Sequence, residues 1–181
     1  IGPGICLAQA IQEAGYCADI LLFHSDDIPL YALDRLRAVS NACTVCTVEN
    51  YANIATDMAR YPVNYAAITR IVIQGKAKLI QSMKTFLQLS DIQAELKHKP
   101  TMHANVFGPM QCMLKGVCAQ CLQWQIDPNT GERTKAVYSC SWQQQPLEII
   151  ALDHLAARNS APYAVVAQLN QLWLDRQDDL I

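Results

Sequence analysis

The sequence predicts an α/β protein: a parallel sheet covered by helices over residues 1–107, then a small β-hairpin subdomain and C-terminal helices. Two patterns indicate this class. In the first 107 residues, apolar runs of strand length alternate with segments whose apolar residues recur at helical spacing. Beyond them, two segments alternate apolar and polar residues on either side of a turn-forming stretch, which is typical of an antiparallel hairpin.

The elements of the first part follow in order along the chain. Gly2-Pro-Gly4 predicts a tight turn that leads into a helix, and Gly15 favours the end of that helix. Further helices are expected over 26–39, over 54–60 and after Gly75, and strands over 18–23, 43–48, 68–74 and 101–107. The strand that should precede Gly2 is nearly absent. We therefore expect this chain to be part of a longer protein, cut just before or within its first βα unit.

The second part contains the predicted hairpin, with its turn at residues 127–131. Its second strand places Cys140 on the same face as Tyr138 and Trp142, so that the thiol returns toward the preceding loop beneath aromatic rings. Two helices are expected in the tail, over about 152–158 and 162–176. The predicted domains are 1–107, 108–145 and 146–181.

The composition is that of an ordinary globular chain. Its 181 residues are 51 % hydrophobic and carry a formal net charge of −2. Neither a basic run nor a basic face indicates a nucleic-acid or anionic-membrane partner. No apolar run approaches the roughly 18 residues of a spanning helix, and no signal peptide is recognisable, so we expect a cytoplasmic protein.

Four cysteines after residue 107 indicate a metal site. Cys112, Cys118, Cys121 and Cys140 have the spacing C-x5-C-x2-C-x18-C. Three thiolates in a short loop, with a fourth on a returning strand, are typical of a [2Fe–2S] cluster, and the spacing has one residue more in its first gap than the plant-type ferredoxin pattern. Thiolate sulfur also suits zinc, so a structural zinc site is the alternative.

The other four cysteines are expected to be structural. Cys43 and Cys46 lie in a predicted strand, where residues three apart point to opposite faces and cannot bind one ion together. Cys6 and Cys17 fall in apolar surroundings. We expect all four to behave as small buried hydrophobic residues.

Three glycines are candidates for a nucleotide site. Gly2 and Gly4 would let the backbone approach a pyrophosphate at the N-terminus of the following helix. Gly75 occupies the corresponding turn after a later strand. A tight strand-to-helix turn without any ligand explains the same glycines equally well.

The cysteine and glycine motifs together resemble the C-terminal part of the ferredoxin-reductase-like electron-transfer flavoprotein family. The cysteine loop, with Ser139-Cys140, is similar to the family's cluster motif, and residues 1–8 are similar to its glycine-rich turn. The resemblance extends to about residue 145 and is greatest to the electron-transfer subunit of dihydroorotate dehydrogenase. It also includes the small subunits of NADH-dependent ferredoxin:NADP oxidoreductase and sulfide dehydrogenase. The chain departs from the family at Leu7, where a proline is usual, and around Gly75, where only the glycine is kept.

The resemblance implies that the chain belongs to an NAD(P)H-linked oxidoreductase. The four cysteines would hold a [2Fe–2S] cluster, and the three glycines would contact NAD(P)H. FAD would bind a β-barrel domain that this chain lacks, so we expect no turnover from the chain alone. Electrons would pass to a flavoprotein partner similar to the glutamate synthase small subunit or to dihydroorotate dehydrogenase. The alternative is a zinc-stabilised structural or interaction domain without a redox role.

Overall fold

The computed structural model describes residues 2–16, 18–24, 30–47, 54–58, 60–61, 63–106 and 121–157. The chain divides into two compact units, residues 1–64 and 65–181, which are considered separately below. The boundary between them lies inside the predicted 1–107 domain.

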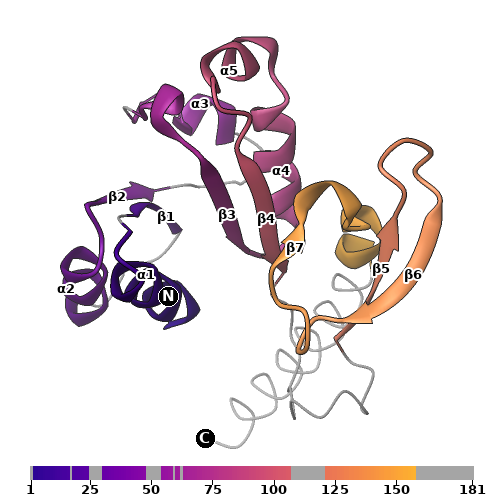
Figure 1. Cartoon of the computed structure of the whole chain (residues 1–181), viewed down its shortest axis with the longest axis horizontal. Helices are drawn as coiled ribbons and strands as arrows, with labels where there is room; N and C mark the ends of the chain where they lie inside the picture. The colour runs from indigo at the N-terminus through magenta and orange to yellow at the C-terminus, as the bar shows by residue number, and fades with distance from the viewer. Residues whose placement is uncertain are drawn as a thin grey trace, which may run out of the picture. The chain divides into compact units, whose positions relative to one another are not determined.

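The first unit is a short βαβ arrangement with a helix in front of it (Figure 1). Its two strands pair in parallel, in register from Asp19 opposite Ala42 to His24 opposite Thr47. A helix joins them, because parallel neighbours need a long crossover connection. The elements are α1 (Gly2–Glu13), β1 (Asp19–His24), α2 (Leu30–Ala38), β2 (Ala42–Thr47) and α3 (Ile54–Met58).

The core of the first unit is small. Its buried apolar residues are Ala8, Ala32, Leu36, Cys46, Ile54 and Met58. Residues 20–23 of β1 are only half-buried, although strands of parallel sheets are usually buried on both faces. This pair of strands is therefore incompletely covered by the described residues of its own unit.

The second unit is built on a three-stranded mixed sheet. Strands β3 and β4 pair in parallel, from Arg70 opposite Thr101 to Gly75 opposite Val106. A two-residue strand, β7, then pairs antiparallel with β4. Helix α4 lies against the parallel strands and contributes much of the core, because its apolar residues share one face (Figure 1). The elements are η2 (Tyr65–Ala67), β3 (Arg70–Gly75), α4 (Ala77–Leu87), α5 (Ser90–Glu95), β4 (Thr101–Val106) and β7 (Gln145–Pro146).

The hairpin of strands β5 (Leu122–Ile126) and β6 (Arg133–Tyr138) completes the described part of this unit. A β-bulge interrupts its ladder: Trp124 pairs with Ala136 and Ile126 with Arg133, so residues 134 and 135 together oppose Gln125. On its other edge, β5 forms a bridge from Gln125 to Ile150, just after η3 (Leu147–Ile149). Residues 152–157 form a helix.

Most of the expected elements are present, and the α/β class is confirmed. The sheets are small and mix parallel with antiparallel pairing, and the antiparallel strand β7 was not expected. The long helix expected after Gly75 is broken into α4 and α5, because Leu89 adopts an extended conformation between them. Gly2 and Gly4 lie in the first turn of α1 instead of preceding it, and the helix expected over 162–176 lies outside the described residues.

The prediction that Cys140 lies on a strand is wrong. Strand β6 ends at Tyr138, and residues 139–141 form a turn. The backbone N–H groups of Ser141 and Trp142 both donate to the Tyr138 carbonyl, at 3.1 and 3.0 Å. These bonds fold residues 138–142 into a tight turn, which takes the chain away from β5.

Gly75 ends β3 where the chain turns directly into α4. A Cβ at this position would lie 2.5 Å from Leu79 Cδ2, although the backbone of Gly75 does not need a positive φ. The glycine is therefore required for the close approach of strand and helix. The atom that it would meet is the end of a side chain that is itself buried.

We expect Gly75→Ala to lower the free energy of unfolding by about 1–2 kcal/mol, because Leu79 must leave its packed position. In a Leu79→Ala background the same substitution should cost clearly less, since the obstructing methyl group is gone. Denaturant unfolding of the four proteins of this double-mutant cycle measures the coupling. Equal costs in both backgrounds would show that the two side chains do not compete for space.

Candidate functional site

Two of the four predicted metal ligands, Cys121 and Cys140, lie at the open end of the hairpin. Cys121 immediately precedes β5, and Cys140 lies in the turn that follows β6. Both the backbone N–H and the hydroxyl of Ser139 donate to the Cys121 carbonyl, at 3.2 and 3.1 Å. These bonds extend the pairing one residue beyond the ladder and bring the two cysteines together.

The Cys121 sulfur has several hydrogen-bond donors around it. Burial alone would raise the pKa of this thiol, but hydrogen bonds from the Cys140 backbone and side chain, and from the N–H groups of Cys121 and Ser139, lower it below its ordinary value. Hydrogen bonds of this kind favour the thiolate, which is the form that binds metal. Cys121 is 5 % exposed and Cys140 is half-buried.

The other two predicted ligands, Cys112 and Cys118, lie outside the described residues. Within the described ranges, no group of three or more His, Cys, Asp or Glu side chains could hold a metal ion. The structure therefore brings together half of the predicted ligand set, as two adjacent thiols.

Buried glutamines beside this site were not expected from the sequence. Gln123, Gln125 and Gln145 are all buried, and the Gln125 amide donates to Gln145 Oε1 at 2.9 Å. The amide of Gln145 donates in turn to the Trp142 carbonyl at 3.3 Å. Buried amides need partners of this kind. The hydrophobic alternation in β5 predicts instead that Leu122, Trp124 and Ile126 face the core. In the structure all three are only half-buried.

The apolar face of the hairpin is partly covered by its own cations. The Arg133 guanidinium lies 5.5 Å from the centre of the Trp124 ring, and Lys135 Nζ lies 5.4 Å from that of Trp142. Such contacts are favourable and shield aromatic surface from water. Trp142, two residues after Cys140, still exposes 37 % of its surface.

The glycines predicted to contact a nucleotide lie at helix N-termini. Gly2 and Gly4 are in the first turn of α1, and Gly75 directly precedes Lys76, the N-cap residue of α4. Free N–H groups at such positions can bind an anion. Nucleotide binding by these residues stays a prediction.

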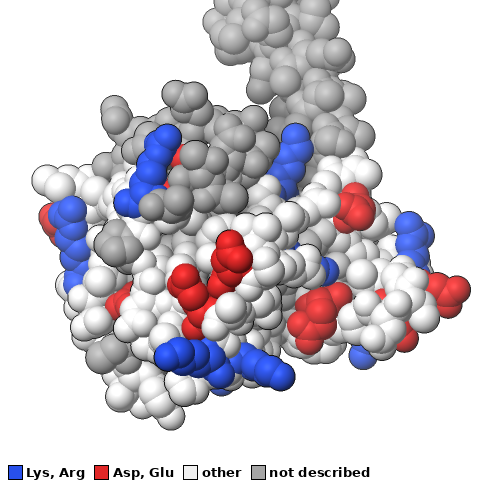
Figure 2. Space-filling view, turned by 90° about the horizontal axis from the view of Figure 1, so that it is seen from above, with Lys and Arg blue, Asp and Glu red and all other residues white. Residues whose placement is uncertain are grey.

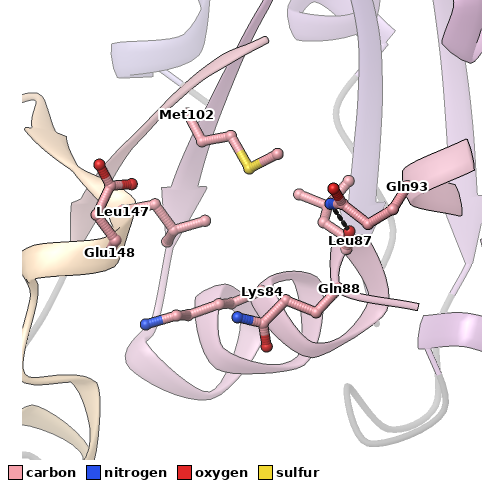
Figure 3. A pocket seen from close by; sticks show the side chains of 7 residues that line it. All are labelled: Lys84, Leu87, Gln88, Gln93, Met102, Leu147 and Glu148. Atoms are coloured by element: carbon pink, nitrogen blue, oxygen red, sulfur yellow. Dashed lines mark hydrogen bonds between the residues drawn. The ribbon is translucent and has the colours of Figure 1, made fainter. Parts of the chain in front are cut away.

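The two described cavities lie elsewhere, at the amino-terminal end of β4. The smaller, about 70 Å³, is lined by residues of α4, α5, β4 and η3, with Lys84 and Gln88 on one side and Glu148 on the other (Figure 3). It is far below the usual size of a small-molecule site. The larger, about 440 Å³, is lined by residues 99–103 with Pro146 and Glu148. In open α/β sheets, ligands bind at the opposite, carboxyl ends of the strands.

The charged side chains are mixed in sign. On the face shown in Figure 2, the described Lys and Arg residues lie among Asp and Glu residues and among many uncharged ones. Among the described helices, none combines the length and the apolar character that crossing a membrane requires.

The remaining cysteines divide into buried and exposed. Cys46 is fully buried in β2, and burial raises its pKa to about 11 despite a hydrogen bond with Tyr61. Burial also raises the pKa of half-buried Cys43, against the charge of Arg37. Both sit in a strand, as predicted. Cys6, expected to be buried, is exposed on α1, and Cys17 lies outside the described residues.

Comparison with known proteins gives little further identification. No protein-family model matches the chain. An uncharacterised protein of Rickettsia prowazekii (strain Madrid E) is 41 % identical over 54 residues, which are 30 % of this chain. The matched segment is only 7 % of that protein's length. The activity of the whole protein is therefore treated below as a proposal.

Cys6 and Cys46 should differ strongly in their reaction with a thiol reagent at pH 8. Cys6 is exposed, whereas Cys46 is inaccessible and, with a pKa of about 11, is thiolate in roughly one molecule per thousand at that pH. Timed alkylation with peptide mass spectrometry should show Cys6 modified first and Cys46 last. In denaturant the difference should vanish, whereas equal rates in the native protein would contradict the burial of Cys46.

Proposed function

We propose that this chain is the electron-transfer portion of an NAD(P)H-linked iron–sulfur flavoprotein oxidoreductase. Its four-cysteine loop would bind a [2Fe–2S] cluster that relays electrons between FAD or NAD(P)H and a partner flavoprotein. The observation that carries the proposal is the meeting of Cys121 and Cys140 across the open end of the hairpin. These residues are 19 positions apart in sequence, yet they are brought together where the N–H and the hydroxyl of Ser139 donate to the Cys121 carbonyl.

The chemistry around the two thiols supports a cluster. Backbone N–H groups point at the Cys121 sulfur, and donors of this kind tune the potential of sulfur-ligated iron. With Cys112 and Cys118 from the preceding loop, four thiolates would complete the coordination of two iron ions. Such a cluster would supply one-electron transfer, and this chain's own residues would hold and orient it.

The pairing of the strands supports a nucleotide-binding α/β domain. In the doubly wound order 3-2-1-4-5, the neighbours include strands 2 and 3 and strands 4 and 5. The parallel pairs β1–β2 and β3–β4 are compatible with neighbours of this kind, each considered within its own unit. NAD(P)H would then contact Gly2, Gly4 and Gly75.

A structural zinc site is the second candidate, and it rests on the same two thiols. Four thiolates bind zinc tetrahedrally and can stabilise a small domain without any redox role. The observation for this option is the core of the hairpin region: three of its buried side chains are glutamines, and a metal would add stability there. The identity of the bound metal distinguishes the two functions.

Protein purified without oxygen from iron-replete cells should be brown and contain about two iron and two sulfide ions per chain. Cys121→Ser and Cys140→Ser should each remove most of the colour and of the iron, because each takes away one ligand. Cys6→Ser is the matched control, since it removes an exposed thiol on α1 and should leave the cluster intact.

Visible absorption, with iron, sulfide and zinc assays on the same samples, gives the readout. About one zinc ion per chain without colour, lost in the same two variants, would assign the structural function instead. Full metal content in either variant would exclude that cysteine as a ligand under both functions.

A further inference from the structure

Three consecutive glutamines, residues 143–145, follow the Cys140 turn, and only the third is buried. Gln143 and Gln144 are exposed, whereas Gln145 keeps 1 % of its surface accessible. Its backbone belongs to β7, opposite Ala104 of β4. Nothing in the composition of this run distinguishes its members, so the difference comes from tertiary contacts alone.

The side chain of Gln145 joins three segments. Its oxygen accepts a hydrogen bond from the Gln125 amide of β5, and its own amide donates to the Trp142 carbonyl. Its backbone holds it in the β3–β4–β7 sheet. Through its side chain and its backbone, this one buried residue connects the first hairpin strand, the turn after β6 and the three-stranded sheet of this unit.

The turn that carries Cys140 is held from both ends. On the hairpin side, Ser139 bonds to the Cys121 carbonyl, and the Trp142 N–H bonds to the Tyr138 carbonyl. On the other side, the Gln145 amide donates to the Trp142 carbonyl. Both the N–H and the carbonyl of Trp142 are thus used to fix the turn two residues beyond Cys140.

We propose that Gln145 is a positioning residue that, through Gln125 and the Trp142 carbonyl, keeps the sulfur of Cys140 beside that of Cys121. The importance of this sulfur position for metal binding rests on the proposed function. The position itself does not, because it follows from the bonds of Ser139 to the Cys121 carbonyl at the end of the hairpin.

The test measures how readily the two thiols form a disulfide. Oxidised glutathione is the oxidant: Cys121 and Cys140 lose two electrons and two protons as an S–S bond forms between them, and glutathione is reduced to two thiols. The background is Cys112→Ser with Cys118→Ser, which cannot form a four-thiolate metal site. The ratio of disulfide to dithiol at equilibrium, read by peptide mass spectrometry, gives the effective concentration of the pair.

Gln145→Met keeps the length and burial of the side chain and removes both hydrogen bonds. We expect the effective concentration to fall about tenfold, which corresponds to about 1.4 kcal/mol. Gln144→Met is the matched control, one residue away and exposed, and should leave the value within about twofold. No change in Gln145→Met, or an equal fall in the control, would overturn the proposal.

A second variant covers the case in which Gln145→Met does not fold, as judged by circular dichroism. Gln125→Met removes the donor to Gln145 but leaves the bond to Trp142 in place, so a fall of about threefold is expected. An unchanged value there would overturn the proposal. Iron content in the chain with all its cysteines tests the proposed function separately, since the disulfide equilibrium is independent of it.

Discussion

The register of the β5–β6 hairpin is the constraint on which the candidate site depends. Once Leu122 is opposite Tyr138, the residues just outside the ladder must meet, and these are Cys121, Ser139 and Cys140. In a hairpin, a shift by one residue moves every side chain to the other face. The register that buries Gln123 and Gln125 of β5 therefore also decides whether the two cysteines, 19 residues apart, can bind one metal ion.

Sequence patterns were sufficient for the elements that depend on local periodicity. Each described strand of the first 107 residues lies within about two positions of its expected range, since a buried apolar run and a following helix signal suffice for a βαβ unit. The hairpin turn was equally clear, because Asp127 and Gly131 are typical turn residues, and Gly131 has a φ of +74°.

The features that the sequence did not predict all depend on contacts between distant segments. Hydrophobic alternation in β5 indicates that Trp124 and its neighbours face the core, yet Gln125 does, because an amide partner comes from β7. The turn at Cys140 and the two-residue strand β7 have no periodicity to detect. The cysteine spacing identified two residues that do meet, Cys121 and Cys140, because the register of the hairpin brings them to its open end.

The bulge in β6 has a consequence for how this hairpin can vary between relatives. Residues 134 and 135 already share one opposing position, so the strand contains a surplus residue on the side of the tip. Gain or loss of a residue there can be taken up by the bulge and the turn. Between Tyr138 and Cys140 the chain is more constrained, because the Tyr138 carbonyl accepts from Ser141 and Trp142 and the Ser139 N–H is bonded to the Cys121 carbonyl. Length variation during evolution should therefore collect at the tip and be rare beside the thiols.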